Sequence, residues 1–202
     1  MTTENDAGIT KLMAAYKHVS CAIRLTFDGE DAVPIYTLAH AGFTVLKDLL
    51  KHRAPARNPF AKVPKAVWDA LGEIPNALKH ADRDPDAIVK YSSEYLSACA
   101  DLSINSCNNL ATRLGQELTP EMKAHQYWLL IARPAEYMLA PVSAEGGDAV
   151  LDTFHANIRS HQLKSWEEKR DIARYVLGRY RDDPQMVAVP LLPAPDRQAP
   201  PR

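Results

Sequence analysis

Apolar residues recur at intervals of three and four along most of this 202-residue chain, and no window alternates steadily between apolar and polar residues. That spacing places apolar side chains on one face of an α-helix, whereas a half-buried strand needs a period of two. The chain has only 8 glycines, about 4% against a typical ~7%. It is therefore short of the residue that tight hairpins and phosphate-binding loops need. We predict an all-α protein.

Residues suited to helix ends divide the chain into separate helices. The predicted N-caps and C-terminal glycines are Gly29, Asp31, Gly115 and Ser165. We predict a single-domain bundle of about six to seven helices over residues 1–183, with an up-and-down antiparallel core. Six of the 15 prolines lie in the last 19 residues. Residues 184–202 are therefore predicted to be a Pro-rich, disordered tail.

The longest predicted helix begins at Asp84-Pro85 and ends before Gly115. Its predicted apolar stripe has spacings of three and four and consists of Ile88, Tyr91, Tyr95, Ala98, Leu102, Ser106, Leu110 and Leu114. Its second half is rich in small polar residues, namely Ser103, Asn105, Ser106, Asn108, Asn109 and Thr112. Because asparagine is a poor helix former, we expect some of these side chains to link helices through a buried polar network or to lie at a dimer seam.

Gly42 lies on the apolar stripe of the second predicted helix. Glycine in a helix interior is less stable than alanine, so its presence there indicates another role. We predict that its missing side chain lets a neighbouring helix approach closely.

Charge, cysteine content and hydropathy exclude several classes of protein. The chain has 24 basic and 25 acidic residues and a net charge of −1, so binding to nucleic acid would need a local basic patch. Its 3 cysteines form no C-x-x-C pair, which predicts reduced thiols rather than a disulfide framework or zinc site. The 7 histidines form no metal-binding pair, so neither a metal nor a cofactor is predicted. We see no signal peptide and no apolar run of about 18 residues, and expect a cytoplasmic protein without membrane contact.

The segment from Lys51 to Lys65, called the basic segment below, contains five lysines and arginines, three prolines and no acidic residue. The prolines predict a loop. The candidate phosphate-binding residues are Lys51, Arg53, Arg57, Lys62 and Lys65. Phe60 lies among them and can stack on a base, so the composition is typical of an RNA or nucleotide contact. The alternative is a solvated connection whose charge favours solubility.

Asn76 and His80 lie four positions apart, so they share one face near the end of a predicted helix. The helix dipole at that end favours a protonated histidine, and Asp82 is near enough in sequence to hydrogen-bond its ring. Because such groups can perform acid–base chemistry, His80, Asn76 and Asp82 are the candidate catalytic residues. The alternative is that they only satisfy carbonyls at the helix end.

The stretch from Asn76 to Asp86, NALKHADRDPD, resembles the motif region of HEPN domains, the higher eukaryote and prokaryote nucleotide-binding superfamily. The resemblance rests on the N-x-x-x-H pair. It implies a small helical bundle, often dimeric, in a bacterial stress or phage-defence setting. HEPN ribonucleases carry an arginine before the polar residue, where this chain has Pro75. The resemblance therefore implies a module without catalysis.

We expect a non-catalytic helical module that works by binding. The partners considered are a second copy of the chain, RNA or a nucleotide at the basic segment, and a protein; a membrane is not expected. The alternative is a HEPN-like, metal-independent endoribonuclease or nucleotide-handling enzyme centred on His80.

Overall fold

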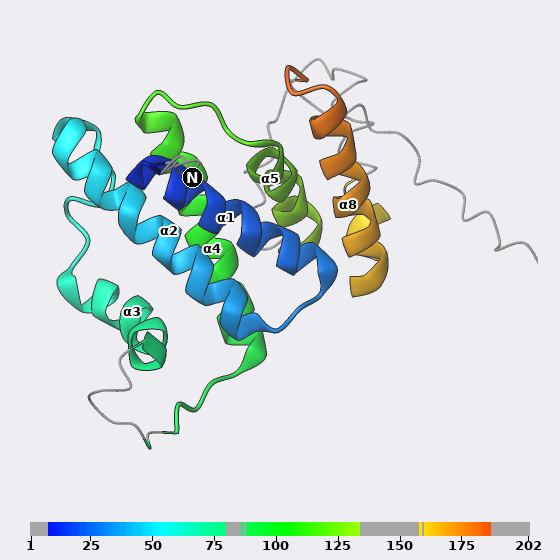
Figure 1. The fold of residues 1–202 in the computed structure, drawn as a ribbon. Helices are drawn as coiled ribbons and strands as arrows, with labels where there is room; N and C mark the ends of the chain where they lie inside the picture. The colour runs from blue at the N-terminus through cyan, green and yellow to red at the C-terminus, as the bar shows by residue number, and fades with distance from the viewer. Residues whose placement is uncertain (1–7, 80–85, 87, 134–157, 159, 187–202) are drawn as a thin grey trace, which may run out of the picture. The chain divides into compact units, whose positions relative to one another are not determined.

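The computed structural model describes residues 8–79, 86, 88–133, 158 and 160–186, and in these ranges the chain is helical apart from turns and connections (Figure 1). This part contains six α-helices and one 3-10 helix, which confirms the all-α prediction. The chain divides into two compact units, Met1–Met122 and Lys123–Arg202. Most of the predicted tail over 184–202 lies outside the described residues.

The first unit is built on a helical hairpin of α1 (Lys11–Asp28) and α2 (Ala32–Arg53) (Figure 1). Gly29 ends α1 with a left-handed φ of 76°, and the Asp31 side chain accepts a hydrogen bond of 2.7 Å from the amide of Val33. Both caps were predicted from the sequence. They confine the connection to three residues, Gly29–Asp31, so the two helices pack side by side as an antiparallel pair.

Gly42 of α2 lies directly against α1, as predicted. A Cβ at this position would come within 2.6 Å of Cγ2 of Val19 and 3.1 Å of the carbonyl oxygen of Ala15. The backbones of α1 and α2 therefore approach as closely as they do because residue 42 has no side chain.

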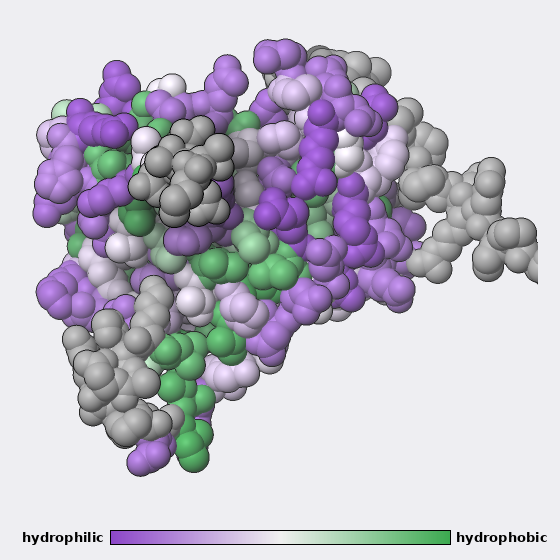
Figure 2. All heavy atoms as spheres, viewed as in Figure 1, coloured by the Kyte–Doolittle hydropathy of each residue, from purple (hydrophilic) through white to green (hydrophobic). Residues whose placement is uncertain are grey.

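The third helix of this core, α4 (Ser93–Arg113), packs along α2, but it begins later than predicted. Its N-cap is Ser92, whose hydroxyl accepts from the amide of Tyr95, and residues 88–92 are not helical. Ile88 is 88% exposed, and Figure 2 shows hydrophobic atoms at the surface along this segment leading into α4. The prediction that the helix starts at Asp84-Pro85 and buries Ile88 is therefore wrong.

The buried face of α4 also differs from the predicted stripe. Tyr95 is 52% and Leu102 46% exposed, whereas the buried face consists of Leu96, Cys99, Ala100, Ser103, Ile104, Cys107, Asn108, Leu110 and Ala111, together with Asp101. Both faces have spacings of three and four, but the buried face carries more small side chains. Small side chains let two helix backbones come close, and this is the face that α4 packs inward.

One of the polar residues of α4 links it to the next helix, α5 (Pro120–Ala132). Asn108 is 2% exposed, and its Nδ2 donates a 3.2 Å hydrogen bond to the carbonyl oxygen of Met122. The start of α5 is held by Thr119, whose Oγ1 accepts from the amide of Met122 and lies 3.2 Å from the hydroxyl of Ser20 on α1. Asn108 thus confirms the expected buried polar link.

The second unit contains the rest of α5 and α8 (Trp166–Asp182). Ser165 caps α8 as predicted, in a reciprocal arrangement with Glu168 that satisfies two backbone amides. The inward face of α8 consists of Ile172, Ala173, Val176, Leu177 and Tyr180. None of the helices in the described ranges has the continuous apolar length that a membrane span requires.

A buried histidine gives the second unit a pH dependence. His161 is 6% exposed, and its Nδ1 lies 2.9 Å from the hydroxyl of Tyr127. Burial, and secondly the charge of Lys164, lower the pKa of His161 below the ordinary 6.5. On acidification the unfolded chain takes up this proton first, so the free energy of unfolding should fall as the pH drops from about 7 through 6.5 toward the folded-state pKa.

His161→Gln is expected to flatten that dependence by at most about 1.4 kcal/mol per pH unit, the contribution of one proton. Urea denaturation at a series of pH values from neutral to mildly acidic measures the slope. An unchanged slope in the variant would mean that another group causes it.

Candidate nucleic-acid interface

The sequence predicted that the basic segment is a loop, but in the structure it is divided among three helical elements and the turns between them. Its first three residues complete the last turn of α2, Pro55–Arg57 form a 3-10 helix, η1, and Lys65 opens α3 (Lys65–Lys79). Basic residues in the last turn favour a helix through its dipole, which lets α2 continue to Arg53. The helix stops at Ala54 because the residue before a proline is driven out of the helical conformation, and Ala54 has φ −149° and ψ 62°.

Four of the five predicted phosphate-binding residues form no ion pair within the described part of the chain. They are all exposed, and they are Lys51, Arg53, Arg57 and Lys62. Lys65 instead pairs with Asp69 at 2.6 Å, so its charge is partly neutralised. The segment therefore presents uncompensated positive charge at the end of α2 and in the turn before α3, although the chain as a whole is nearly neutral.

Arg57 is held by a partner that the sequence did not reveal. Its Nη1 donates to the carbonyl oxygen of Arg113 at 3.3 Å, and Nη1 of Arg113 donates to the carbonyl oxygen of Arg57 at 3.2 Å. This exchange attaches η1 to the end of α4 and adds a sixth cation to the surface. No local signal marks Arg113 as a member of this site, because it lies 56 positions along the chain.

Phe60, expected to stack on a base, is already engaged inside the protein. Its ring lies 5.7 Å from Phe43 of α2 and 5.4 Å from Trp68 of α3, edge-on to both, and Phe43 lies 5.6 Å from Trp68. Aromatic pairs at these separations stabilise beyond their buried area. The three rings therefore fix the turn of the basic segment against the two helices, and Phe60 has a structural role.

A second contact between α2 and α3 depends on Pro75. Proline has no backbone N–H, so within α3 it leaves the carbonyl of Leu71 without its intrahelical donor. The hydroxyl of Tyr36 on α2 donates to that carbonyl. Burial raises the pKa of Tyr36 above its ordinary value, which keeps this hydroxyl protonated. Pro75, the residue that departs from the HEPN pattern, thus has a part in placing α3.

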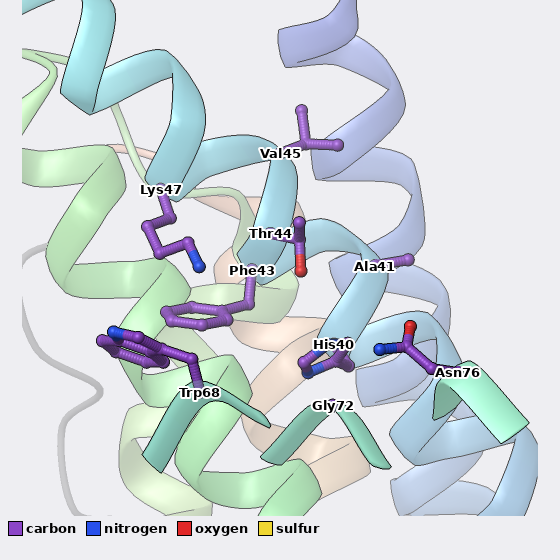
Figure 3. A pocket seen from close by; sticks show the side chains of 9 residues that line it. All are labelled: His40, Ala41, Phe43, Thr44, Val45, Lys47, Trp68, Gly72 and Asn76. Atoms are coloured by element: carbon purple, nitrogen blue, oxygen red, sulfur yellow. The ribbon is translucent and has the colours of Figure 1, made fainter. Parts of the chain in front are cut away.

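Between α2 and α3 lies a groove of about 410 Å³ (Figure 3). We define the α2–α3 groove by its lining residues, which are His40, Ala41, Phe43, Thr44, Val45 and Lys47 from α2 and Trp68, Gly72 and Asn76 from α3. Lys47 is its cation, and its Nζ lies 4.7 Å from the centre of the Trp68 ring. Among the described residues Lys47 makes no ion pair.

The structure places Asn76 at the open edge of this groove, with its amide directed toward His40 (Figure 3). A Cβ at Gly72 would lie 3.0 Å from Nδ2 of Asn76 and 3.7 Å from Nε2 of His40, so glycine keeps the space between them open. The other two candidate catalytic residues, His80 and Asp82, lie outside the described residues. Sequence reasoning thus named Asn76 but missed its neighbour His40, since only the pairing of α2 with α3 brings the two together.

A second cavity, of about 540 Å³, lies beside α1 and the segment that precedes α5. Its charged residues are partly paired, since Arg24 meets Glu121 at 3.3 Å. Burial raises the pKa of Tyr16 in its wall to about 12, so that phenol stays neutral. No cluster of three or more metal-binding side chains occurs within the described ranges. Between the two cavities, the α2–α3 groove is the one that adjoins the basic segment.

No protein-family model matches this chain, and no curated protein or solved structure matches it either. The resemblance to HEPN domains therefore stays a prediction, and the chemistry of the interface has to be argued from its own geometry.

Proposed function

We propose that this protein is a non-catalytic helical module that binds single-stranded RNA through its basic segment. The observation that carries the proposal is the set of exposed cations, Lys51, Arg53 and Lys62, which lack ion pairs in the described part of the chain. Lysine and arginine that meet phosphates release condensed counterions, and this release supplies most of the affinity of sequence-independent binding. Because the net charge is −1, the attraction is local.

The way the segment is held supports this role. The exchange between Arg57 and Arg113 and the ring contacts of Phe60 fix two points of the segment on the helical core. Cations on a fixed backbone lose less conformational entropy on binding than cations on a free loop. A bacterial stress or phage-defence setting and a homodimer are further parts of the proposal, and they rest on the resemblance of Asn76–Asp86 to HEPN domains. The endoribonuclease alternative would use His80, Asn76 and Asp82.

The proposal is tested by measuring the binding of a fluorescently labelled single-stranded RNA by anisotropy at several salt concentrations. If the five predicted cations each contact a phosphate, the affinity should fall about 100-fold between roughly 50 and 200 mM salt, since each contact contributes about 0.7 to the slope. Replacing Lys51, Arg53 and Lys62 together with alanine leaves two contacts, and the fall should shrink to about sevenfold.

A matched control removes three positive charges elsewhere, in Lys11, Lys17 and Lys90, which are also exposed. It should bind nearly as tightly as the natural protein. The proposal would be contradicted if both triple variants lost RNA affinity equally, or if the affinity of the natural protein did not change with salt. RNA cleavage that disappears in His80→Ala would instead favour the endoribonuclease.

A further inference from the structure

The α2–α3 groove continues the basic segment along one face of α2. Thr44, Lys47 and Lys51 are separated by three and four positions, so they follow one another on the same side of the helix. Lys47 and Lys51 are about 6 Å apart along the helix axis. A strand whose phosphates meet Lys51 therefore passes the mouth of the groove.

The groove offers an aromatic surface to a flat ring. Trp68 is half-buried and packs against Phe43 with an angle of 33° between the rings, so its orientation is fixed. The Lys47 ammonium now lies over Trp68, a contact that contributes about two- to fivefold to an equilibrium at exposed sites. Stacking of a base on an aromatic side chain contributes about 5- to 150-fold. A base can therefore take the place of the ammonium, which is then free to meet a phosphate.

Polar groups at the other end of the groove suit the edge of a base. Asn76 offers an amide donor and an acceptor side by side, and Thr44 a hydroxyl. Neither side chain makes a hydrogen bond within the part of the chain that the structure describes. The edges of unpaired bases present donors and acceptors in the same adjacent manner. The volume of about 410 Å³ lies within the usual range for small-ligand pockets, roughly 300–1,000 Å³.

We propose that the α2–α3 groove binds one unpaired base of the RNA, stacked on Trp68 and held at its edge by Asn76, with Lys47 on an adjoining phosphate. This inference rests on the proposed RNA binding and adds to it a contact that depends on the base. It makes the protein selective for single-stranded over double-stranded RNA, because a paired base can reach neither Trp68 nor Asn76.

The test compares a single-stranded RNA with an abasic oligomer of the same length and phosphate number. The natural protein should bind the RNA about 5- to 150-fold more tightly, the contribution of one stacked base. Gly72→Ala places a methyl group between Asn76 and His40, in the space that the edge of the base would occupy, and should reduce this preference, while the affinity for the abasic oligomer and its salt dependence stay unchanged. Asn76→Ala, at an exposed position, should also reduce the preference.

Gly72→Ala should not unfold the protein, because alanine favours a helix and the nearest atom is the end of the Asn76 side chain. A melting curve checks this. Gly178→Ala in α8, where a Cβ meets nothing within 4 Å, makes the same change away from the groove and should keep the full preference. Equal binding of both oligomers with normal salt dependence, or an undiminished preference in Gly72→Ala, would overturn the base site alone. Failure to bind either oligomer would overturn the RNA-binding proposal and the base site with it.

Discussion

Replacing Ile104 with alanine is expected to lower the free energy of unfolding by about 2–5 kcal/mol. Ile104 is 0% exposed and lies on the buried face of α4. Removing its three outer carbons forfeits their burial and leaves a cavity that the surrounding side chains cannot fully close. Equilibrium unfolding in urea, followed by circular dichroism, measures the loss.

Leu102→Ala is the matched control, because it removes the same number of carbons from the same helix two positions away. Leu102 is 46% exposed, so its loss should change the unfolding free energy by no more than about 0.5 kcal/mol. The pair decides which face of α4 is in the core. If Leu102→Ala lowered the free energy of unfolding more than Ile104→Ala, the face of α4 predicted from the sequence would be the buried one.

Replacing Gly42 with leucine is expected to destabilise the fold by about 3 kcal/mol, at the upper end of the usual range for overpacking. Even the first added carbon would meet Cγ2 of Val19 at 2.6 Å and the carbonyl oxygen of Ala15 at 3.1 Å. Val19 cannot turn away, because a β-branched side chain in a helix has essentially one rotamer. The remaining carbons can be accommodated only if α1 and α2 separate.

The smaller change, Gly42→Ala, should cost less, about 1–2 kcal/mol, because the clash is partly offset by a gain in helix propensity of up to about 1 kcal/mol. Gly178→Ala isolates that gain, since its added Cβ meets no atom within 4 Å, and it should stabilise its helix by about 0.5–1 kcal/mol. Thermal and urea unfolding of the three variants give the comparison. Stabilisation by Gly42→Ala would show that the two helices are not in close contact at this point.

These two predictions also mark how far the sequence alone can go. The helix starts at Asp31 and Ser165 were predicted correctly because a cap acts on amides two or three residues away, whereas the start of α4 was predicted too early. The buried face of α4 was predicted wrongly, because two faces of this helix have apolar residues at suitable spacing. Which of them is buried depends on how the side chains fit against the neighbouring helices. Gly42 was interpreted correctly because glycine weakens a helix interior, and within an apolar stripe a close helix–helix contact is what offsets that cost.

Parts of the candidate interface could likewise be predicted from the sequence, and parts could not. The run of cations without an acidic residue is visible in the sequence, and the structure describes all five of its lysines and arginines. The pairing of Lys65 with Asp69 is a local i,i+4 contact that the sequence could have indicated, whereas the contact of Arg57 with Arg113, 56 positions away, could not be predicted. The α2–α3 groove could not be predicted, since His40 and Asn76 become neighbours only when the two helices pair.

The exchange between Arg57 and Arg113 determines how an anion would be received at this surface. Each guanidinium is held by a neutral carbonyl rather than a carboxylate, so both keep their full charge while staying in place. Within the described part of the chain, a phosphate arriving there displaces no carboxylate, whereas at Lys65 it must compete with Asp69. The two arginines are thus ready to receive an anion without first giving up an ion pair.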